Sequence, residues 1–310
     1  MKDADPESCH ELLSLKSSVP SIESTALGRT NATVSRIGFG GAPAGLTNYL
    51  NPFSPVDTEQ REGVIAALGR AVEVGINYFD TAAAYGSGES EKIFGEGLAT
   101  AGIKTKRNDI YVATKVSHDE GNPRESIERS LKNLRLDVID LVQVHGTTYT
   151  PEARDQTLRK GGTLEVLERA RDEGLIRHIG FTTEDQNPPV YEFIASGRFD
   201  VMQTCYNLVF QHTYEPTRPF GSIYEADKAG MGIVTMRSLT ASVFQRWMKA
   251  ARPDDDFDYT PALLQFVLSN KLIDVALVGM RTPEEVDKNI AVLNDTENRI
   301  DLNDLHEKFV

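Results

Sequence analysis

Four side chains that can hold or transfer a proton lie at the ends of three consecutive apolar segments. Asp80 and Tyr85 follow the second apolar segment of the chain, Lys115 ends the third, and His145 ends the fourth. A free tyrosine has a pKa of about 10 and donates protons poorly near neutral pH. We expect the Lys115 ammonium to stabilise the Tyr85 phenolate and lower its pKa, while Asp80 holds Lys115. A neutral His145 would orient a carbonyl oxygen beside Tyr85. The set predicts protonation of that oxygen as a hydride reaches carbon.

Each residue taken alone also has an ordinary structural interpretation. Asp80 could cap a helix, and Lys115 could be a solvated charge at the end of a strand. Tyr85 could be surface packing, and His145 a histidine with structural hydrogen bonds only. Their occurrence together at the ends of consecutive strands favours the catalytic interpretation, because such ends meet at one edge of a parallel sheet or barrel.

Eight short apolar segments are the predicted strands. They are continuous rather than alternating, which is typical of parallel strands covered on both faces. They span residues 37–39, 78–79, 110–113, 139–144, 176–181, 201–205, 233–236 and 275–278. A polar start of residues 1–22 and a hairpin around residues 27–31 precede the first of them.

Helical spacing separates these segments, as in Ile127, Leu131 and Leu134, and again in Val286, Ile290 and Leu293. Glycines suited to helix C-termini follow several helices: Gly75, Gly102, Gly174, Gly197 and Gly230. Eight strand–helix units predict a (β/α)8 TIM barrel over residues 23–310, with a doubly wound sheet plus a small extra domain as the alternative. The longest irregular stretches, 40–56, 146–159, 207–221 and 237–260, all follow strands and would meet at one mouth.

Composition excludes several classes of protein. The 310 residues carry 33 Lys and Arg against 46 Asp and Glu, a net charge of −13, which argues against nucleic-acid binding. No run approaches the roughly 18 apolar residues of a membrane span, and we expect no signal peptide. Two cysteines, Cys9 and Cys205, are too few for a disulfide scaffold or a thiolate zinc site. We expect a cytoplasmic protein without nucleic-acid or membrane partners.

Several motifs resemble those of the aldo-keto reductase superfamily over about residues 24–295. They are FDTAAAYG (79–86), EKIFG (91–95), ATK (113–115), LKNLRLDVID (131–140), IRHIG (176–180), QTCYN (203–207) and VGMRTPEEV (278–286), with Asn289. The resemblance implies a (β/α)8 barrel, a nicotinamide dinucleotide bound at its mouth and reversible carbonyl reduction. It also implies Tyr85 as general acid and base, Lys115 and Asp80 as its tuning pair, and His145 as the group that orients the carbonyl.

The resemblance places the nicotinamide beside the ends of the fifth to seventh strands. Thr182 stands where relatives have a serine that binds the carboxamide, and its hydroxyl keeps a hydrogen bond available. Gln203 matches the glutamine that binds the same carboxamide. Met236 replaces a stacking aromatic residue, and its thioether can pack on a ring. Arg237 and Ser238 could donate to the pyrophosphate, or belong to a solvated loop.

The adenosine end leaves NADP(H) and NAD(H) open. Gly279 and Glu285 stand where NADP-dependent relatives carry cations, and Asn289 aligns with a family asparagine. A carboxylate repels a 2′-phosphate and can accept a hydrogen bond from a free 2′-hydroxyl. Arg281 could supply a substitute cation, and the helix N-terminus after it favours phosphate. NADP(H) is the first choice, and NAD(H) is the alternative.

The predicted function is NAD(P)-dependent interconversion of a small aldehyde, ketone or sugar with its alcohol. Candidates for the pocket wall are Pro43, Tyr49, Thr147, Tyr149, Phe210 and Trp247, and polar loop residues including Asn48 and Asn207 fit a hydroxylated substrate. One alternative is a cofactor-sensing binding or regulatory subunit on the same barrel. Another is a metal-dependent hydrolase, but the six histidines show no metal-ligand spacing, and no metal is expected.

Overall fold

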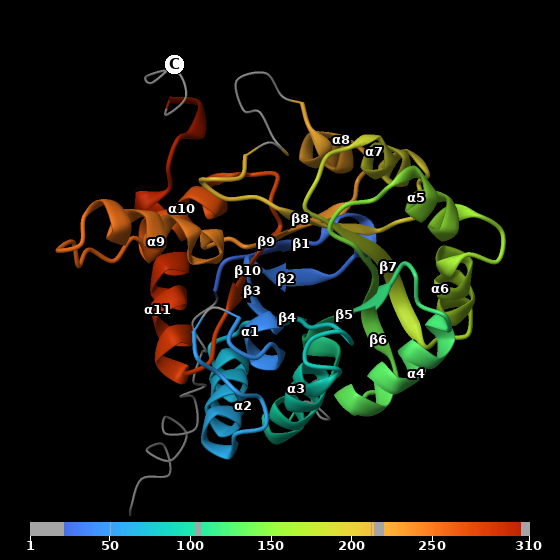
Figure 1. The fold of residues 1–310 in the computed structure, drawn as a ribbon, viewed down its shortest axis with the longest axis horizontal. Helices are drawn as coiled ribbons and strands as arrows, with labels where there is room; N and C mark the ends of the chain where they lie inside the picture. Colours follow the sequence, from blue (N-terminus) through green and yellow to red (C-terminus); the bar gives the residue numbers. More distant parts are fainter. Residues whose placement is uncertain (1–21, 50, 103–106, 212, 214–219, 305–310) are drawn as a thin grey trace, which may run out of the picture.

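The computed structural model describes residues 22–49, 51–102, 107–211, 213 and 220–304. Eight parallel strands close into a barrel in the order β10-β3-β4-β5-β6-β7-β8-β9, and helices surround it (Figure 1). The strands are β3 (Ile37–Gly40), β4 (Tyr78–Asp80), β5 (Tyr111–Ser117), β6 (Ile139–His145), β7 (Ile176–Thr183), β8 (Val201–Cys205), β9 (Gly232–Met236) and β10 (Val275–Gly279). The predicted TIM barrel is confirmed, and the open doubly wound alternative is wrong because β10 pairs with both β3 and β9.

Every strand of the barrel is followed by at least one helix. The outer helices are α2 (Thr58–Glu73), α3 (Glu89–Thr100), α4 (Pro123–Leu134), α6 (Thr163–Asp172), α7 (Pro188–Ala195), α8 (Ser222–Lys228), α10 (Thr260–Ser269) and α11 (Pro283–Asn294). The two predicted helical patterns lie in α4 and α11. Each of the five expected glycines follows a helix with positive φ, which L side chains rarely adopt.

Three of the four predicted irregular stretches, 40–56, 146–159 and 237–260, contain short helices, whereas much of the fourth, 207–221, lies outside the described residues. The short helices are α1 (Ala42–Gly45), α5 (Pro151–Leu158), the 3-10 turn Thr240–Ser242 and α9 (Val243–Ala251). Proline at the first turn of α1 and α5 starts them, because its fixed φ suits that position. These short helices follow β3, β6 and β9, so they lie at the barrel mouth.

A hairpin packs against the opposite end of the barrel. Strands β1 (Ser24–Ala26) and β2 (Thr33–Ser35) pair antiparallel around the 3-10 turn Gly28–Thr30, as predicted. A Cβ at Gly28 would lie 2.1 Å from the Gly232 backbone nitrogen at the start of β9, so only glycine fits. Leu27 is fully buried with lumen side chains such as Tyr78 and Val275. The N-terminal end of the lumen is therefore filled with packed side chains.

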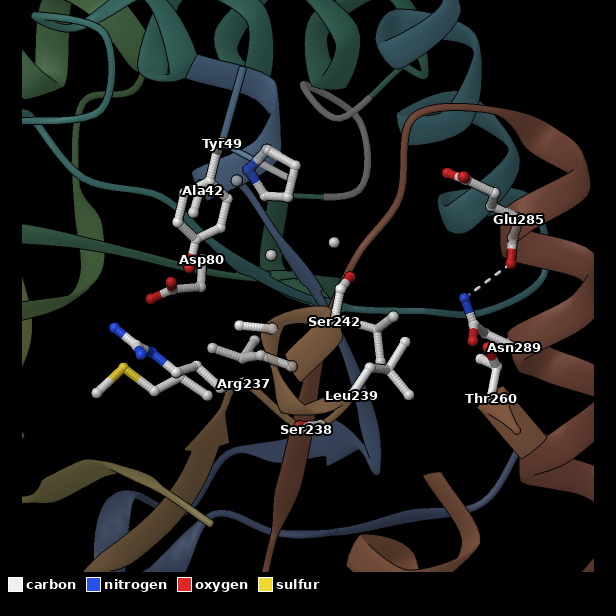
Figure 2. A pocket seen from close by; sticks show the side chains of 18 of the residues that line it. Ala42, Tyr49, Asp80, Arg237, Ser238, Leu239, Ser242, Thr260, Glu285 and Asn289 are labelled. Carbon is white, nitrogen blue, oxygen red and sulfur yellow. Dashed lines mark hydrogen bonds between the residues drawn. The ribbon is translucent and has the colours of Figure 1, made fainter. Parts of the chain in front are cut away.

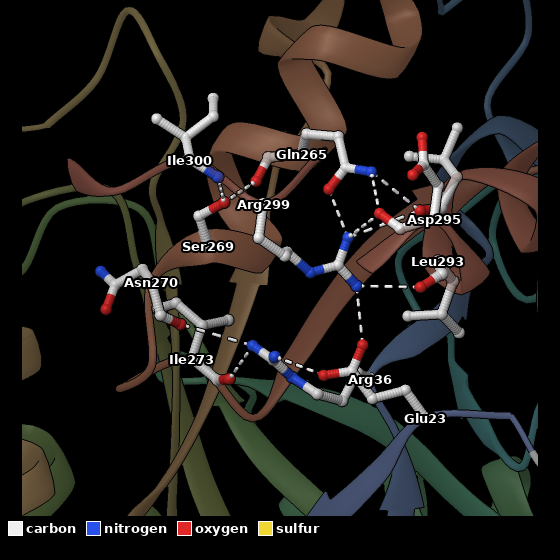
Figure 3. A network of polar contacts seen from close by, with 11 residues as sticks. Glu23, Arg36, Gln265, Ser269, Asn270, Ile273, Leu293, Asp295, Arg299 and Ile300 are labelled. Carbon is white, nitrogen blue, oxygen red and sulfur yellow. Dashed lines mark hydrogen bonds and ion pairs between the residues drawn. The ribbon is translucent and has the colours of Figure 1, made fainter. Parts of the chain in front are cut away.

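A polar network joins segments around the starts of β3 and β10 (Figure 3). Glu23 accepts from Arg36 Nη1 at 2.9 Å and from Arg299 Nη2 at 2.6 Å. Arg36 Nη2 also donates to the Ile273 carbonyl at 3.0 Å, and Arg299 donates to Gln265. This network ties the segment after α11 to the barrel at the end opposite the mouth.

Two further 3-10 turns span Arg107–Asp109 and Thr296–Asn298.

The predicted N-terminal extension lies outside the described residues except for its last member. Ile22 is 8% exposed, and its side chain lies beside Gly75 at the end of α2. Ile22 therefore packs with the barrel core. No helix within the described ranges combines the length and apolar composition that crossing a membrane requires.

Candidate active site

A cavity of about 900 Å³ opens at the mouth, where the C-terminal ends of the strands meet. Asp80, Tyr85, Lys115 and His145 line it together with Tyr49 from the loop after β3. The cavity extends from these side chains to helix α11, whose Glu285 and Asn289 lie on its far side in Figure 2. The mouth of the barrel is where enzymes with this fold carry their sites.

The structure brings the four predicted catalytic side chains together. Lys115 Nζ lies 2.6 Å from Asp80 Oδ1 and 2.6 Å from the Thr81 carbonyl oxygen. The same Nζ is 5.0 Å from the centre of the Tyr85 ring. The ring centres of Tyr85 and His145 are 5.8 Å apart and nearly perpendicular. Asp80 ends β4, His145 ends β6, and Lys115 lies two residues before the end of β5.

Burial controls the electrostatics of this cluster. The side chains of Lys115 and Asp80 are 1% and 4% exposed. Burial lowers the pKa of Lys115, but Asp80 and Tyr85 outweigh it and hold that pKa above its usual value. Burial raises the pKa of Asp80, and Lys115 opposes this. Lys115 therefore stays an ammonium ion near neutral pH.

The expected net lowering of the Tyr85 pKa is not found. Burial raises the pKa of Tyr85, and Lys115 pulls it back without reversing the direction. Tyr85 is consequently protonated near neutral pH, the form needed to donate a proton. Burial, followed by the charge of Lys115, lowers the pKa of His145 to about 3. His145 is thus a neutral imidazole, which can act as a hydrogen-bond donor to an oxygen.

A buried glutamine, absent from the sequence prediction, extends the cluster. Gln143 Nε2 donates to Asp80 Oδ2 at 3.2 Å and to Gln203 Oε1 at 3.1 Å. Gln143 lies two residues before His145 on β6, so both side chains point to the same face of the strand. The sequence feature that could have identified Gln143 is a glutamine inside an otherwise apolar strand segment. It links the ion pair to the expected nicotinamide site.

The predicted nicotinamide contacts all line the cavity, but one of them is already bonded. The Thr182 hydroxyl accepts from the Gly146 N–H at 3.0 Å and donates to the Gly146 carbonyl at 2.7 Å. The backbone after His145 therefore uses the donor and one acceptor lone pair of this hydroxyl, and its second lone pair stays open to a hydrogen bond from a ligand. Gln203 and Met236 lie at the same end, with Nε2 and Sδ 4.0 Å apart.

Arg237 and Ser238 also line the cavity, in a different arrangement from the one expected. Arg237 Nη2 lies 2.6 Å from Glu184 Oε1, a residue that follows β7 and that sequence reasoning missed. The Ser238 side chain is buried and lies 3.2 Å from the Thr235 hydroxyl. In Figure 2 the Arg237 guanidinium points toward the side of Asp80, away from Glu285.

At the other end of the cavity, Gly279, Glu285 and Asn289 line the wall, with Lys288 as an unpredicted neighbour. Asn289 Nδ2 donates to the Glu285 carbonyl at 2.8 Å. The Glu285 carboxylate accepts the Arg281 backbone N–H at 2.6 Å, so it helps to cap α11. A Cβ on Gly279 would lie 2.4 Å from Pro43 Cγ, which leaves no room for a side chain there.

Arg281 does not line the cavity. Its guanidinium lies 4.1 Å from the Phe53 ring centre, and Nε donates to the Pro43 carbonyl at 3.0 Å. The loop after β3 therefore holds this cation by a cation–π contact and a hydrogen bond. The expectation that Arg281 replaces the missing cation is not supported by this geometry.

The predicted pocket wall divides in the same way. Pro43, Tyr49 and Thr147 line the cavity, whereas Tyr149, Phe210, Trp247, Asn48 and Asn207 do not. Tyr149 is buried beneath the mouth, where its hydroxyl donates to the Val144 carbonyl at 3.0 Å. Trp247 on α9 is 59% exposed. Asn207 is buried and donates to the Arg237 carbonyl at 2.8 Å.

Comparison with known proteins agrees with this fold. L-galactose dehydrogenase of Arabidopsis thaliana is 29% identical over 304 residues, covering 89% of each chain. An aldo-keto reductase of Bacillus halodurans, solved in its holo form, superposes with a TM-score of 0.66 at 23% identity, over 89% of this chain and 92% of that one. An aldo/keto reductase of Klebsiella pneumoniae, in complex with NADP and acetate, gives 0.67 at 20% identity over 93% and 94%.

A family model matches more than half of the chain. It covers residues 36–261, from the residue before β3 into the start of α10, and so includes all four candidate catalytic residues. This match and the closed barrel agree with the motifs in the sequence, and the chain belongs to the aldo/keto reductase family.

Proposed function

We propose that this protein is an NAD(P)-dependent oxidoreductase that interconverts a small aldehyde, ketone or sugar carbonyl with the corresponding alcohol. The observation that carries the proposal is the meeting of Tyr85, Lys115, Asp80 and His145 at one end of the cavity. A binding protein has no need for a buried ammonium beside a tyrosine, because burying such a charge is costly.

The residues present fit a nicotinamide dinucleotide. The cavity volume lies within the range of cofactor pockets, roughly 300–1,000 Å³. Gln203 offers an amide and Met236 an apolar surface at the catalytic end, and the first turns of α11 line the other end. NADP(H), which the Klebsiella relative binds, is the proposed cofactor. NAD(H) is the alternative, because Glu285 rather than Arg281 lines the adenosine end.

When bound, the reduced dinucleotide supplies the hydride, with its two electrons, for the carbonyl carbon. His145, neutral at physiological pH, donates a hydrogen bond to the carbonyl oxygen and orients it. Tyr85 gives its proton to that oxygen, so that the C=O double bond becomes C–O–H. The Lys115 ammonium stabilises the phenolate left behind, and Asp80 keeps Lys115 beside it. Water then returns a proton to Tyr85. Oxidation of the alcohol is the reverse.

The test combines turnover with cofactor binding. Purified protein is assayed for oxidation of NADPH and NADH with a panel of aldehydes, ketones and sugars, and for the reverse reaction. Tyr85→Phe should lower kcat by roughly a hundredfold or more, the scale of a lost general acid. Quenching of protein fluorescence should give nearly the same cofactor Kd for both proteins. No turnover by the wild type with any substrate would refute the enzyme proposal. Undiminished turnover by Tyr85→Phe would refute the role of the phenol.

A further inference from the structure

An ion pair that the mechanism does not use forms part of the cavity wall. Arg237 Nη2 and Glu184 Oε1 are 2.6 Å apart, with side chains 34% and 27% exposed. Both residues line the cavity that contains Tyr85 and His145. A surface pair of this kind contributes little to stability, about 0–1 kcal/mol. A contribution to stability therefore does not explain why this ion pair lies in the cavity wall.

The backbone of Glu184 is bound to the loop that carries His145. Its N–H donates to the Thr147 carbonyl at 2.7 Å, and Thr182 bonds Gly146 on the same loop. Glu184 thus follows β7 at a place determined by the residues directly after the carbonyl-orienting histidine. The carboxylate accepts a hydrogen bond from Arg237, whose guanidinium points to the Asp80 side of the cavity in Figure 2.

The backbone of Arg237 is also fixed in place by hydrogen bonds. It adopts φ of 57°, a conformation that costs a non-glycine residue energy and that tends to occur at functional sites. Its carbonyl accepts from the buried Asn207 side chain at 2.8 Å and from the Thr240 N–H at 2.7 Å. Figure 2 shows the side chain pointing to the side of the cavity that contains Asp80 and Tyr49. The pair therefore spans from the end of β7 to the end of β9.

We propose that the Glu184–Arg237 pair binds neighbouring hydroxyl groups of the substrate, so that the enzyme prefers carbonyl compounds carrying a vicinal diol, such as aldoses. This inference rests on the proposed function. A guanidinium donates only and a carboxylate accepts only, so together they match a diol, in which each hydroxyl both donates and accepts. An unpaired arginine would select an anionic substrate. Glu184 neutralises that charge and favours a neutral, hydroxylated one.

Glyceraldehyde and propanal test this inference, because both are three-carbon aldehydes and only the first carries a vicinal diol. We expect the wild type to show a higher kcat/KM for glyceraldehyde. Glu184→Gln and Arg237→Gln should each lower that value roughly ten- to hundredfold, the scale of a lost hydrogen bond to a charged group. The loss should be mainly in KM. The glyceraldehyde-to-propanal ratio of kcat/KM should fall by a similar factor.

A matched ion pair away from the cavity serves as the control. Arg198 Nη2 and Glu168 Oε2 are also 2.6 Å apart, with side chains 35% and 24% exposed. Glu168→Gln and Arg198→Gln should leave the ratio unchanged. The Kd of NADPH, measured by fluorescence, separates a substrate role from a cofactor role, and we expect less than a threefold change in the cavity variants.

Two results would overturn the inference while leaving the proposed function intact. One is a ratio unaffected by both cavity variants. The other is a tenfold weaker Kd for NADPH with equal losses on both aldehydes, which would assign the pair to cofactor binding. Absence of turnover by the wild type with either aldehyde and with the wider panel would instead refute the proposed function, and this inference with it.

Discussion

Replacing Lys115 by methionine should damage both stability and turnover, and the two losses can be separated. Methionine has a similar length without the charge, so the change leaves Asp80 buried with no cationic partner at 2.6 Å. Removing one member of a buried pair costs about 3–5 kcal/mol of unfolding free energy. With an unfolding entropy near 2.1 cal/mol/K per residue, or about 0.65 kcal/mol/K for 310 residues, the Tm should fall by about 5–8 °C.

The pH dependence of this loss identifies its cause. Burial already raises the pKa of Asp80, and Lys115 opposes that rise. In Lys115→Met the folded-state pKa should rise further above the unfolded value of about 3.9. A carboxyl group with a raised folded-state pKa binds its proton more tightly in the folded protein, so its destabilising effect decreases as the pH falls. The Tm difference from wild type should therefore be smaller at pH 5 than at pH 8.

A double variant completes the test. Asp80→Asn combined with Lys115→Met removes both charges, and its Tm should recover most of the loss, since replacing a buried pair by uncharged groups is often near neutral. Its turnover should not recover, because Tyr85 still lacks the ammonium. We expect kcat of Lys115→Met and of the double variant to be roughly 10²- to 10⁴-fold below wild type. A double variant no more stable than Lys115→Met, or a single variant with wild-type kcat, would show that the electrostatic reasoning is wrong.

Two further predictions concern opposite ends of the cavity. Glu285→Gln should strengthen binding of NADPH relative to NADH by roughly three- to fivefold at low salt. The reason is that a carboxylate about 5 Å from a phosphate repels it by near 1 kcal/mol in water. Fluorescence titration of both cofactors in low and high salt measures this change. An unchanged NADPH-to-NADH ratio of Kd would place Glu285 away from the 2′ position. The His145 pKa of about 3 lies below its unfolded value, so its contribution to stability is present above about pH 6.5 and is lost as the pH falls toward 3. Unfolding midpoints of His145→Gln should therefore decline less between those pH values than those of wild type, and equal declines would contradict the assignment.

Local patterns in the sequence were sufficient for the architecture. Strand and helix periodicity and the glycines after helices are short-range signals, and the eight predicted strands all occur. Asp80 and His145 end their strands, and Lys115 lies near the end of its own, so parallel closure of the barrel alone brings them to one mouth. Gln143 could have been recognised by the same period-two reasoning, because it shares a strand face with His145.

Only the tertiary structure decided which polar groups are available to a ligand. Arg281 is withdrawn from the cavity by Phe53 and Pro43, which are more than 220 positions away in the sequence. The Thr182 hydroxyl is bonded to Gly146, and Glu184 meets Arg237 across the end of the barrel. Such pairings depend on which loops pack together, and no local periodicity encodes that. The raised pKa of Tyr85 has the same origin, because burial is the summed effect of many distant contacts.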